Sequence, residues 1–238
     1  MRLAGRIALI TGASRGLGAA TALAYAREGA HCVLVARTVG GLEEVDDRIK
    51  ALGGSATLVP LDVTDGPGLD RLGAALHERF GRVDILLGNA GILGTLSPVG
   101  HIEPAIFERV MAVNVTANWR LIRSLDPLLR QSDAGRAIFV TSGISRKDVP
   151  YWGAYAASKA ALDMLVGIYA AEVAHTNVRV NLFNPGPIRT ALRAQAFPGE
   201  DPAKQTPPEA HAEALIRLAL PSCTLTGQWV AGDEALGA

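Results

Sequence analysis

The sequence is poor in the residues that mark several classes of protein. It holds two cysteines, Cys32 and Cys223, at no CxxC or metal-binding spacing, so we expect free thiols and no disulfide framework. Aromatic residues make up 5% of the chain, and the formal net charge is zero. Nucleic-acid binding relies on a basic face and on stacking aromatics. We therefore expect no nucleic-acid partner.

Long apolar runs and metal-ligand patterns are also missing. No uninterrupted apolar stretch of about 18 residues occurs, so no membrane-spanning helix is expected. The short apolar run within residues 1–12 predicts a first strand rather than a signal peptide. The five histidines show no metal-ligand spacing, and we expect no metal site. Together these absences favour a cytoplasmic protein that acts on a small molecule.

What the sequence does contain is a regular alternation of strand-like and helix-like segments. Helical patterns separate apolar runs typical of strands, at residues 6–12, 31–37, 56–63, 83–91, 136–143 and 178–186. Such alternation produces right-handed βαβ units and a parallel sheet, and strands this apolar indicate helices on both faces. We therefore expect one α/β domain over residues 1–238, a Rossmann fold with a doubly wound parallel sheet of about seven strands.

The composition changes between residues 190 and 208. This stretch contains Phe197-Pro198-Gly199 and Pro207-Pro208, and regular patterns resume after it. Proline and glycine at this density favour a loop or a short helix rather than a linker between domains. We expect residues 190–208 to form a lid over the substrate.

A glycine-rich turn follows the first strand. The segment that begins at Thr11 has glycines at Gly12, Gly16 and Gly18 and leads into a helix. Glycines let a backbone turn tightly against a pyrophosphate, whose charge is favoured at a helix N-terminus. The spacing is GxxxGxG rather than GxGxxG, and its position between a strand and a helix indicates a dinucleotide site.

The end of the second strand indicates which dinucleotide is bound. NAD-binding proteins carry a carboxylate there for the ribose hydroxyls. This chain has Ala36 followed by Arg37, and Arg15 lies within the glycine turn. Guanidinium groups bind a phosphate through charge-assisted hydrogen bonds. The sequence therefore predicts NADP(H) rather than NAD(H).

Two further strand ends carry residues suited to the cofactor. Asp62 and Val63 end the third strand, and we expect the Asp62 carboxylate to accept a hydrogen bond from the adenine amino group. A helix cap is the alternative role for this carboxylate. Asn89, Ala90 and Gly91 end the fourth strand, where small residues let the backbone lie against the cofactor.

A tyrosine and a lysine stand four residues apart on one predicted helix. Tyr155 and Lys159 share a helix face, and Ser142 ends the fifth strand 13 residues before the tyrosine. The unperturbed pKa of tyrosine is about 10, and a nearby cation lowers it. The pattern predicts that Tyr155 is a general acid/base whose pKa is lowered by Lys159.

These motifs together resemble the short-chain dehydrogenase/reductase family. The segments TGASRGLG, NAG, VNV, YAASK and NPGPIRT, with Ser142, occur in the family's order over essentially the whole chain. The resemblance implies that Tyr155 is the acid/base and that Ser142 orients the substrate oxygen. It also implies that Lys159 binds the nicotinamide ribose and lowers the pKa of Tyr155.

The resemblance assigns roles to further residues. It implies that Asn114, within a long helix, holds a water of the proton relay. It implies that Thr190 and the backbone of Ile188 meet the nicotinamide carboxamide. Arg15 and Arg37 look like the family's NADP-selecting pair.

The sequence departs from the family pattern in two places. Gly88 stands where a second Asn often precedes the NAG turn, a change we expect to be tolerated. The C-terminal tail GDEALGA lacks the usual Asp-Gly-Gly ending, which bears on subunit contacts and on the pocket floor. Residues 184–209 resemble a bacterial branch of the family typified by an uncharacterised cytoplasmic oxidoreductase.

The predicted site comprises three overlapping groups of residues. The predicted catalytic residues are Asn114, Ser142, Tyr155 and Lys159. The predicted cofactor-binding residues are Gly12, Ser14, Arg15, Gly16, Leu17, Gly18, Arg37, Asp62, Val63, Asn89, Ala90, Gly91, Tyr155, Lys159, Pro185, Gly186, Ile188 and Thr190. The predicted substrate-binding residues are Ser142, Ile144, Trp152 and Tyr155, with Leu93, Gly143, Tyr151, Leu192 and Phe197 as further apolar candidates, and Arg146, Lys147 and Arg193 as candidates for an anionic substrate group.

The pattern as a whole predicts an NADP(H)-dependent oxidoreductase that interconverts a ketone and a secondary alcohol on an apolar substrate. Two alternatives stay open: a 3-oxoacyl-thioester (acyl carrier protein) reductase, and a non-catalytic NADP(H)-binding sensor or scaffold. The joint presence of the four catalytic residues favours an enzyme over the second alternative. The helical segment at residues 161–174 is apolar nearly all round and needs cover on more than one side, so we expect a homo-oligomer, either a dimer or a tetramer.

Overall fold

A single parallel sheet forms the centre of the molecule. The computed structural model describes residues 1–232, and the predicted departure in the C-terminal tail therefore falls almost entirely outside the described residues. The strand order is β3-β2-β1-β4-β5-β6-β7, and every adjacent pair is parallel. The strands are β1 (Ile7–Thr11), β2 (His31–Ala36), β3 (Ser55–Pro60), β4 (Ile85–Gly88), β5 (Arg136–Val140), β6 (Arg179–Asn184) and β7 (Trp229–Ala231).

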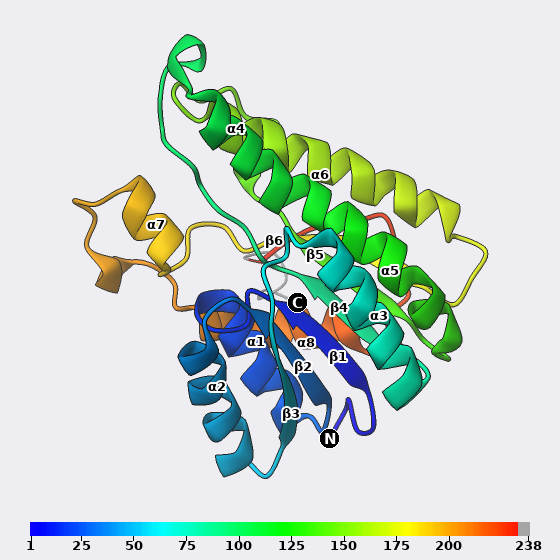
Figure 1. The fold of residues 1–238 in the computed structure, drawn as a ribbon. Coiled ribbons are helices and arrows are strands. Elements are labelled where there is room, and N and C mark those ends of the chain that lie inside the picture. Colours follow the sequence, from blue (N-terminus) through cyan, green and yellow to red (C-terminus); the bar gives the residue numbers. More distant parts are fainter. Residues whose placement is uncertain (233–238) are drawn as a thin grey trace.

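Helices cover both faces of this sheet, as Figure 1 shows. One face packs against α1 (Gly16–Arg27), α2 (Val39–Ala51) and α8 (Ala212–Ala219), and the other against α3 (Gly66–Phe80), α5 (Ala117–Gln131) and α6 (Gly153–Glu172). Neighbouring residues of β1 illustrate the two layers, because Ile10 lies in the first core and Leu9 in the second. The predicted α/β fold with a doubly wound seven-stranded sheet is confirmed.

The strand order of the sheet reverses between β1 and β4, and this reversal creates a crevice there. The chain runs outward from β1 to β3, then returns to place β4 on the other side of β1. Loops at the carboxyl ends of these two strands diverge to opposite faces of the sheet. Doubly wound sheets bind their ligands at such a switch point.

The long helix predicted around Asn114 is interrupted. Helix α4 (Pro104–Met111) continues into a π-helical turn over Ala112–Thr116 and then into α5. Side-chain contacts explain the wider turn, because the Asn114 amide bonds both backbone groups of Ile92. A π turn inserts one extra residue and is frequent at functional sites.

The predicted lid stands apart from the sheet. It begins with α7 (Ala191–Ala196) and continues through 3₁₀ turns at Pro202–Lys204 and Pro208–His211. Figure 1 shows α7 and the following loop projecting beyond the carboxyl edge of the sheet. A short parallel bridge between Ile188 and Thr206 joins the two ends of the excursion. This geometry is suited to a lid, whose role stays a prediction.

Two classes of feature are absent from the described part of the chain. No helix within residues 1–232 combines the length and apolar character that a membrane crossing requires. Nor do these residues contain a group of three His, Cys, Asp or Glu side chains arranged for a metal ion.

A buried carboxylate fastens the amino-terminal edge of the sheet. Asp84 precedes β4, and its side chain is fully buried. It accepts hydrogen bonds from the Ile7 backbone N–H at 2.8 Å, from Ser132 Oγ at 2.6 Å and from Arg82 Nε at 3.0 Å, and Arg6 lies at 3.3 Å. This one side chain therefore links β1, β4 and the segment that leads into β5.

We expect Asp84→Asn to lower the free energy of unfolding by about 3 kcal/mol, because two guanidinium groups lose a buried partner. Urea denaturation of the isolated protein measures this difference. The control is Asp133→Asn, since Asp133 also pairs with Arg6 but has a 72% exposed side chain. That exposed pair should contribute less than about 1 kcal/mol. Equal losses of unfolding free energy from the two substitutions would contradict the role of Asp84 as a buried link between strands.

Candidate active site

A cleft of about 1370 Å³ runs along the carboxyl edge of the sheet, from the glycine turn to α7. Most predicted site residues border it: Gly12, Ser14, Arg15, Gly16, Leu17, Arg37, Asp62, Val63, Asn89, Ala90, Gly91, Ser142, Ile144, Trp152, Tyr155, Lys159, Pro185, Gly186, Ile188 and Thr190. Gly18 and Asn114 instead lie behind its wall. The cleft therefore joins residues from both ends of the chain, from the glycine turn to the predicted lid.

The glycine turn has a backbone that other residues would strain. Gly12 and Gly16 adopt φ angles of +64° and +57°, in the left-handed region. Gly18 is required for packing, because a Cβ atom there would lie 2.3 Å from the carbonyl oxygen of Gly12 and 2.7 Å from Asn89 Nδ2. The glycines thus keep the N-terminus of α1 open towards the cleft while the turn packs against the end of β4.

Hydrogen bonds close the gap between β1 and β4. The Thr11 hydroxyl donates to the Leu87 carbonyl at 3.3 Å and accepts from the backbone N–H groups of Asn89 at 3.0 Å and Ala90 at 3.1 Å. Asn89 Nδ2 donates to the Thr11 carbonyl at 2.8 Å. Local sequence does not reveal this role for Thr11, because the residue is the last one of an otherwise apolar strand.

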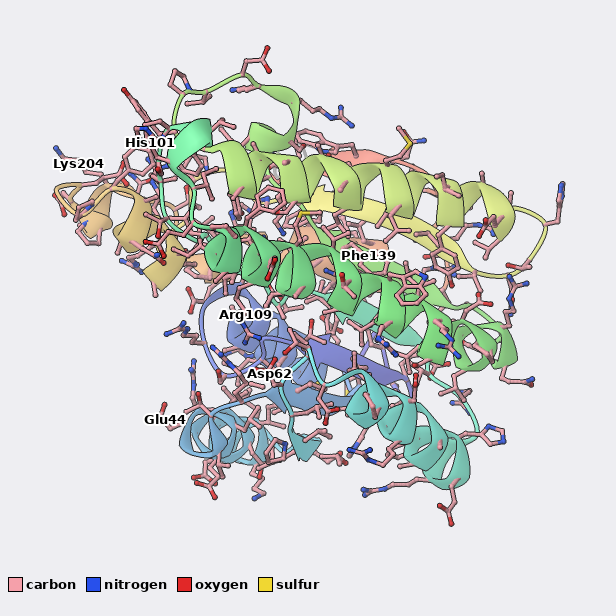
Figure 2. The ribbon with its side chains drawn as sticks, turned by 45° about the horizontal axis from the view of Figure 1, so that its top comes forward. Glu44, Asp62, His101, Arg109, Phe139 and Lys204 are labelled. Atoms are coloured by element: carbon pink, nitrogen blue, oxygen red, sulfur yellow. The ribbon has the colours of Figure 1, made fainter. Side chains whose placement is uncertain are left out.

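Charged side chains gather at the end of the cleft beside β2 and β3. Asp62 Oδ2 accepts from Arg109 Nη2 at 3.0 Å, and an Arg37 nitrogen lies 3.9 Å from the same oxygen. Asp62 Oδ1 accepts from the backbone N–H and the hydroxyl of Thr64. Figure 2 shows Arg109, on α4, reaching towards Asp62. Sequence reasoning missed Arg109, which lies 47 residues away and carries no local signal.

The environment keeps Asp62 ionised. Burial opposes ionisation, but the hydrogen bonds from Thr64 and Arg109 outweigh it and lower the pKa of Asp62 to about 2. The carboxylate is therefore an acceptor at neutral pH, as its expected contact with an adenine amino group requires. The contact with adenine stays a prediction. The alternative role of Asp62 as a helix cap is wrong, because Asp65 caps α3 by accepting from the Gly68 N–H.

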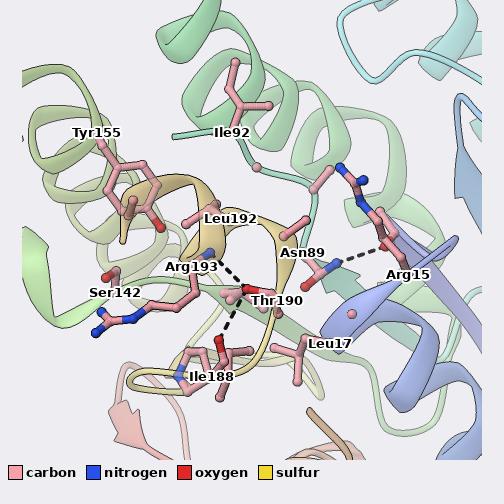
Figure 3. Close-up of a pocket in the computed structure, with 18 of the residues that line it drawn as sticks. Arg15, Leu17, Asn89, Ile92, Ser142, Tyr155, Ile188, Thr190, Leu192 and Arg193 are labelled. Atoms are coloured by element: carbon pink, nitrogen blue, oxygen red, sulfur yellow. Dashed lines mark hydrogen bonds between the residues drawn. The ribbon is translucent and has the colours of Figure 1, made fainter. Parts of the chain in front are cut away.

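The other end of the cleft holds the predicted catalytic groups. Tyr155 and Lys159 lie one turn apart on α6, and Ser142 follows β5. Figure 3 shows the Tyr155 phenol and Ser142 on the same side of the cleft, where the Ser142 side chain favours ionisation of the phenol. The Lys159 ammonium donates to the Val140 carbonyl at 2.8 Å and lies 5.8 Å from the centre of the Tyr155 ring.

Burial sets the ionisation of these groups. Desolvation raises the pKa of Tyr155 to about 12, against the interaction with the Ser142 side chain, which lowers it. Desolvation likewise lowers the pKa of Lys159 to about 8, against the field of Asp163. The expected lowering of the Tyr155 pKa by Lys159 is therefore absent in the protein alone, because the ammonium is directed at the Val140 carbonyl. At neutral pH the phenol keeps its proton.

The Asn114 side chain forms its hydrogen bonds with other groups of the protein. It is buried, accepts from the Ile92 N–H at 2.9 Å and donates to the Ile92 carbonyl and to Ser158 Oγ, each at 2.9 Å. Ser158 in turn donates to the Tyr155 carbonyl at 2.7 Å. Asn114 therefore joins the loop after β4 to the helix that carries Tyr155. Its implied role in holding a water stays a prediction.

Asn184 begins the NPGPIRT motif and has no role predicted from the sequence, yet it organises two loops of the site. Its Oδ1 accepts from the backbone N–H groups of Gly143 and Gly186, both at 3.1 Å. The contact ties the segment after Ser142 to the NPGPIRT loop. Beyond this loop, Thr190 caps α7 by accepting from the Arg193 N–H at 3.3 Å, and Figure 3 shows this cap.

The lid end of the cleft is largely apolar and aromatic. Trp152 lies between Tyr155 and Phe197, with ring centres 6.0 and 5.8 Å away. Arg193 stacks on Phe197 at 3.9 Å and forms two hydrogen bonds with Glu200, at 2.6 and 2.7 Å. Its positive charge is therefore balanced within the lid.

Three of the weaker substrate candidates lie elsewhere. Leu93 is a core residue that is only 2% exposed, and Tyr151 is 59% exposed outside the cleft. Arg146 lies 4.5 Å from the Trp229 ring centre and so is anchored away from the cleft, whereas Lys147 borders it. Local sequence could not separate these neighbours, because the direction of each side chain depends on the turn after β5.

We expect Gly18→Ala to destabilise the fold by about 2 kcal/mol or more, because the added methyl group meets backbone at 2.3 Å. The matched control is Gly40→Ala near the start of α2, where a Cβ atom would meet nothing within 4 Å. That change should stabilise the protein by about 0.5–1 kcal/mol. Thermal denaturation of both variants compares them, and equal melting temperatures would refute the packing argument.

Comparison with known proteins places this arrangement in a family. Residues 6–201 match the family model of short chain dehydrogenases. The chain is 39% identical over 206 residues to the uncharacterized oxidoreductase YciK of Escherichia coli, which covers 85% of this chain and 81% of that protein. A short chain dehydrogenase of Pseudomonas syringae has a structure with a TM-score of 0.94 and 40% identity, covering 97% of this chain and 96% of the other. A short chain dehydrogenase of Shigella flexneri complexed with NADP has a TM-score of 0.94 and 36% identity over 98% of both chains. The chain therefore belongs to the short-chain dehydrogenase family of oxidoreductases.

Proposed function

We propose that the protein interconverts a ketone and a secondary alcohol on an apolar substrate, with NADP(H) as its cofactor. The observation that carries this proposal is the convergence of Ser142, Tyr155 and Lys159 at one end of a cleft whose other end holds the glycine turn. These three side chains come from two elements and provide a proton donor, a second hydroxyl and a cation within one buried corner. Such a set suits carbonyl chemistry.

The cleft fits a dinucleotide. Glycines at positive φ leave the N-terminus of α1 open to a pyrophosphate, and the cleft volume accommodates an extended cofactor. Arg15 and Arg37 border the same end, and Ala36 stands where NAD-binding proteins have a carboxylate. The ion pair of Arg37 with Asp62 spans 3.9 Å at the surface, so it costs little to exchange for a phosphate. The NADP complex of the Shigella flexneri relative supports the same choice.

The residues divide the chemistry between them. The nicotinamide, when bound, supplies or accepts the hydride. Tyr155 donates its phenolic proton to the substrate oxygen in the reductive direction, and its pKa of about 12 in the protein alone keeps that proton in place at neutral pH. Ser142 orients the same oxygen. Lys159 would hold the ribose of the bound cofactor, and its positive charge would then favour the phenolate left behind.

An apolar substrate agrees with the lid end of the cleft. Ile144, Trp152, Leu192 and Phe197 border this end. The charge of Arg193 is taken up by Glu200, which leaves the aromatic surfaces to select the substrate. We propose that residues 190–208 close over a hydrophobic carbonyl compound there.

We further propose a homo-oligomer. Large apolar side chains are exposed on α5 and α6, with Trp119 at 43%, Met164 at 67% and Ile168 at 50%. Monomers seldom expose a patch of this kind without covering it. A second copy of the chain would bury these side chains.

The proposed selectivity for NADP(H) rests on Arg37. We expect NADPH to bind at least tenfold more tightly than NADH, and Arg37→Ala to remove most of this gap, because a charge-assisted contact contributes about 1.5–3 kcal/mol. Fluorescence titration of both cofactors measures the ratio. Arg27→Ala at the end of α1 serves as the control. Equal affinities in the unaltered protein would refute the cofactor assignment.

The proposed reaction rests on Tyr155. A panel of ketones, quinones and 3-oxoacyl thioesters, assayed by NADPH oxidation, should give turnover with apolar ketones or quinones. We expect Tyr155→Phe to reduce kcat by about 10²–10⁴-fold with NADPH affinity unchanged, because the proton donor is lost. Tyr151→Phe, at an exposed tyrosine, should leave kcat unchanged.

The same panel separates the alternatives. Turnover restricted to 3-oxoacyl thioesters would indicate the acyl-carrier substrate, and NADPH binding without turnover on any compound would indicate a sensor or scaffold. Retention of full activity in Tyr155→Phe would rule out the proposed acid.

A further inference from the structure

Asp163 lies behind the catalytic corner and has no part in the chemistry described so far. It follows Lys159 by one turn on α6, the helix that also carries Tyr155. Its carboxylate faces the end of β5, where Oδ1 accepts a hydrogen bond from the Thr141 hydroxyl and Oδ2 accepts one from Ser145 Oγ at 2.6 Å. Both carboxylate oxygens are therefore engaged with the segment that contains Ser142.

The two hydroxyls that Asp163 holds stand on either side of Ser142. Thr141 precedes it and is also tied to β6, because its backbone N–H donates to the Phe183 carbonyl at 2.9 Å. Ser145 follows it in a short 3₁₀ turn, and its backbone N–H donates to the Ser142 carbonyl at 3.0 Å. Asp163 thus bridges both flanks of Ser142 to the helix of Tyr155. Rigid support of this kind fixes the distance between two groups that share one substrate atom.

Asp163 also stands one helical turn from a buried cation. Lys159 is 4% exposed, and the field of Asp163 opposes the effect of burial on its pKa. Tyr155 is the other titratable group near this ammonium on α6. On the segment after β5, Arg146 and Lys147 are cations, and the Asp148 carboxylate is exposed to solvent. The carboxylate therefore supports the charged form of Lys159 through space.

We propose that Asp163 is a positioning residue that fixes Ser142 relative to Tyr155 and sustains the positive charge of Lys159. The contribution to turnover rests on the proposed function. The two structural parts, the position of Ser142 and the charge of Lys159, stand without it. One carboxylate serves both roles because it stands one turn from Lys159 on α6 and accepts hydrogen bonds from hydroxyls on both sides of Ser142.

The charge of Lys159 can be titrated directly in the protein without cofactor or substrate. The chain has four lysines, so labelling their Cε atoms with ¹³C gives a simple NMR spectrum, and Lys159→Met identifies the resonance. Asp163→Asn keeps a similar shape but removes the negative charge. We expect the Lys159 titration to move to lower pH in this variant, because the ammonium loses a stabilising anion. The titration should stay in place in Asp126→Asn, where the altered carboxylate contacts Tyr169 at the far end of α6. An unmoved midpoint in Asp163→Asn overturns this part of the proposal.

The position of Ser142 requires a different variant. Asp163→Ala removes both hydrogen bonds, and a crystal structure should show residues 141–145 displaced and Ser142 Oγ farther from the Tyr155 phenol. Asp163→Asn should retain the original position, since the amide oxygen accepts from one hydroxyl and the amide nitrogen donates to the other. Ser142 in place in the alanine variant would overturn the positioning role. Should Asp163→Ala not fold, Asp163→Ser provides a shorter side chain with the same expected displacement.

Kinetics then links the position to turnover. With whichever carbonyl compound the panel identifies, we expect Asp163→Ala to lose about 10–100-fold in kcat, with little change in the KM for NADPH. We expect Asp163→Asn to recover most of this loss at pH values below its shifted Lys159 titration, where the ammonium is still charged. A merely structural role would lower stability without this recovery or the shift in the Lys159 titration. Absence of turnover on every compound would count against the proposed function alone, because the titration and the crystal structure decide the roles of Asp163.

Discussion

The closure of β1 against β4 is the constraint on which the cleft depends. Thr11 and Asn89 exchange hydrogen bonds across the point where the sheet reverses its order, and Gly12 and Gly18 let the two strand ends approach. The glycine turn and the NAG turn consequently share one wall. Any residue larger than glycine at position 18 would separate them, and the cradle for a pyrophosphate would be lost with the contact.

Burial, rather than the pairing of opposite charges, governs the catalytic corner. A phenol and an amine that leave water both favour their neutral forms, so the pKa of Tyr155 rises and that of Lys159 falls. The nearby dipoles and the Asp163 carboxylate moderate these shifts without cancelling them. The corner therefore holds a proton on the phenol and a partly stabilised cation one turn away. At the opposite end of the cleft, hydrogen bonds outweigh burial at Asp62, which stays ionised.

The features that sequence predicted well are those encoded locally. Alternating apolar runs specify strands and helices, and glycine spacing specifies a turn, so the sheet and the glycine turn follow directly. The spacing of Tyr155 and Lys159 likewise places both on one helix face. Contacts between elements that are distant in the sequence have no such local signal. Arg109 meets Asp62, and Asn184 meets Gly143, only because the loops of the sheet converge.

Some local patterns were also insufficient. The spacing of Lys159 and Tyr155 predicted a lowered pKa for the tyrosine. The Lys159 ammonium is instead directed at the Val140 carbonyl at the end of β5. Neighbours such as Trp152 and Tyr151 are similar in character, yet one borders the cleft and the other faces solvent. Asp163 does carry a local signal, because it stands at helical spacing from Lys159, but its hydroxyl partners come from the segment after β5.

The π turn at Ala112–Thr116 makes the length of the chain here as important as its composition. A π turn takes up one extra residue within a helix, so deleting one residue would convert the turn to regular helix and change the directions of the side chains within the turn. Asn114 would then lose its hydrogen bonds to Ile92. Insertions and deletions, which surface loops tolerate, should therefore be excluded from this segment during evolutionary change, even where substitutions are accepted.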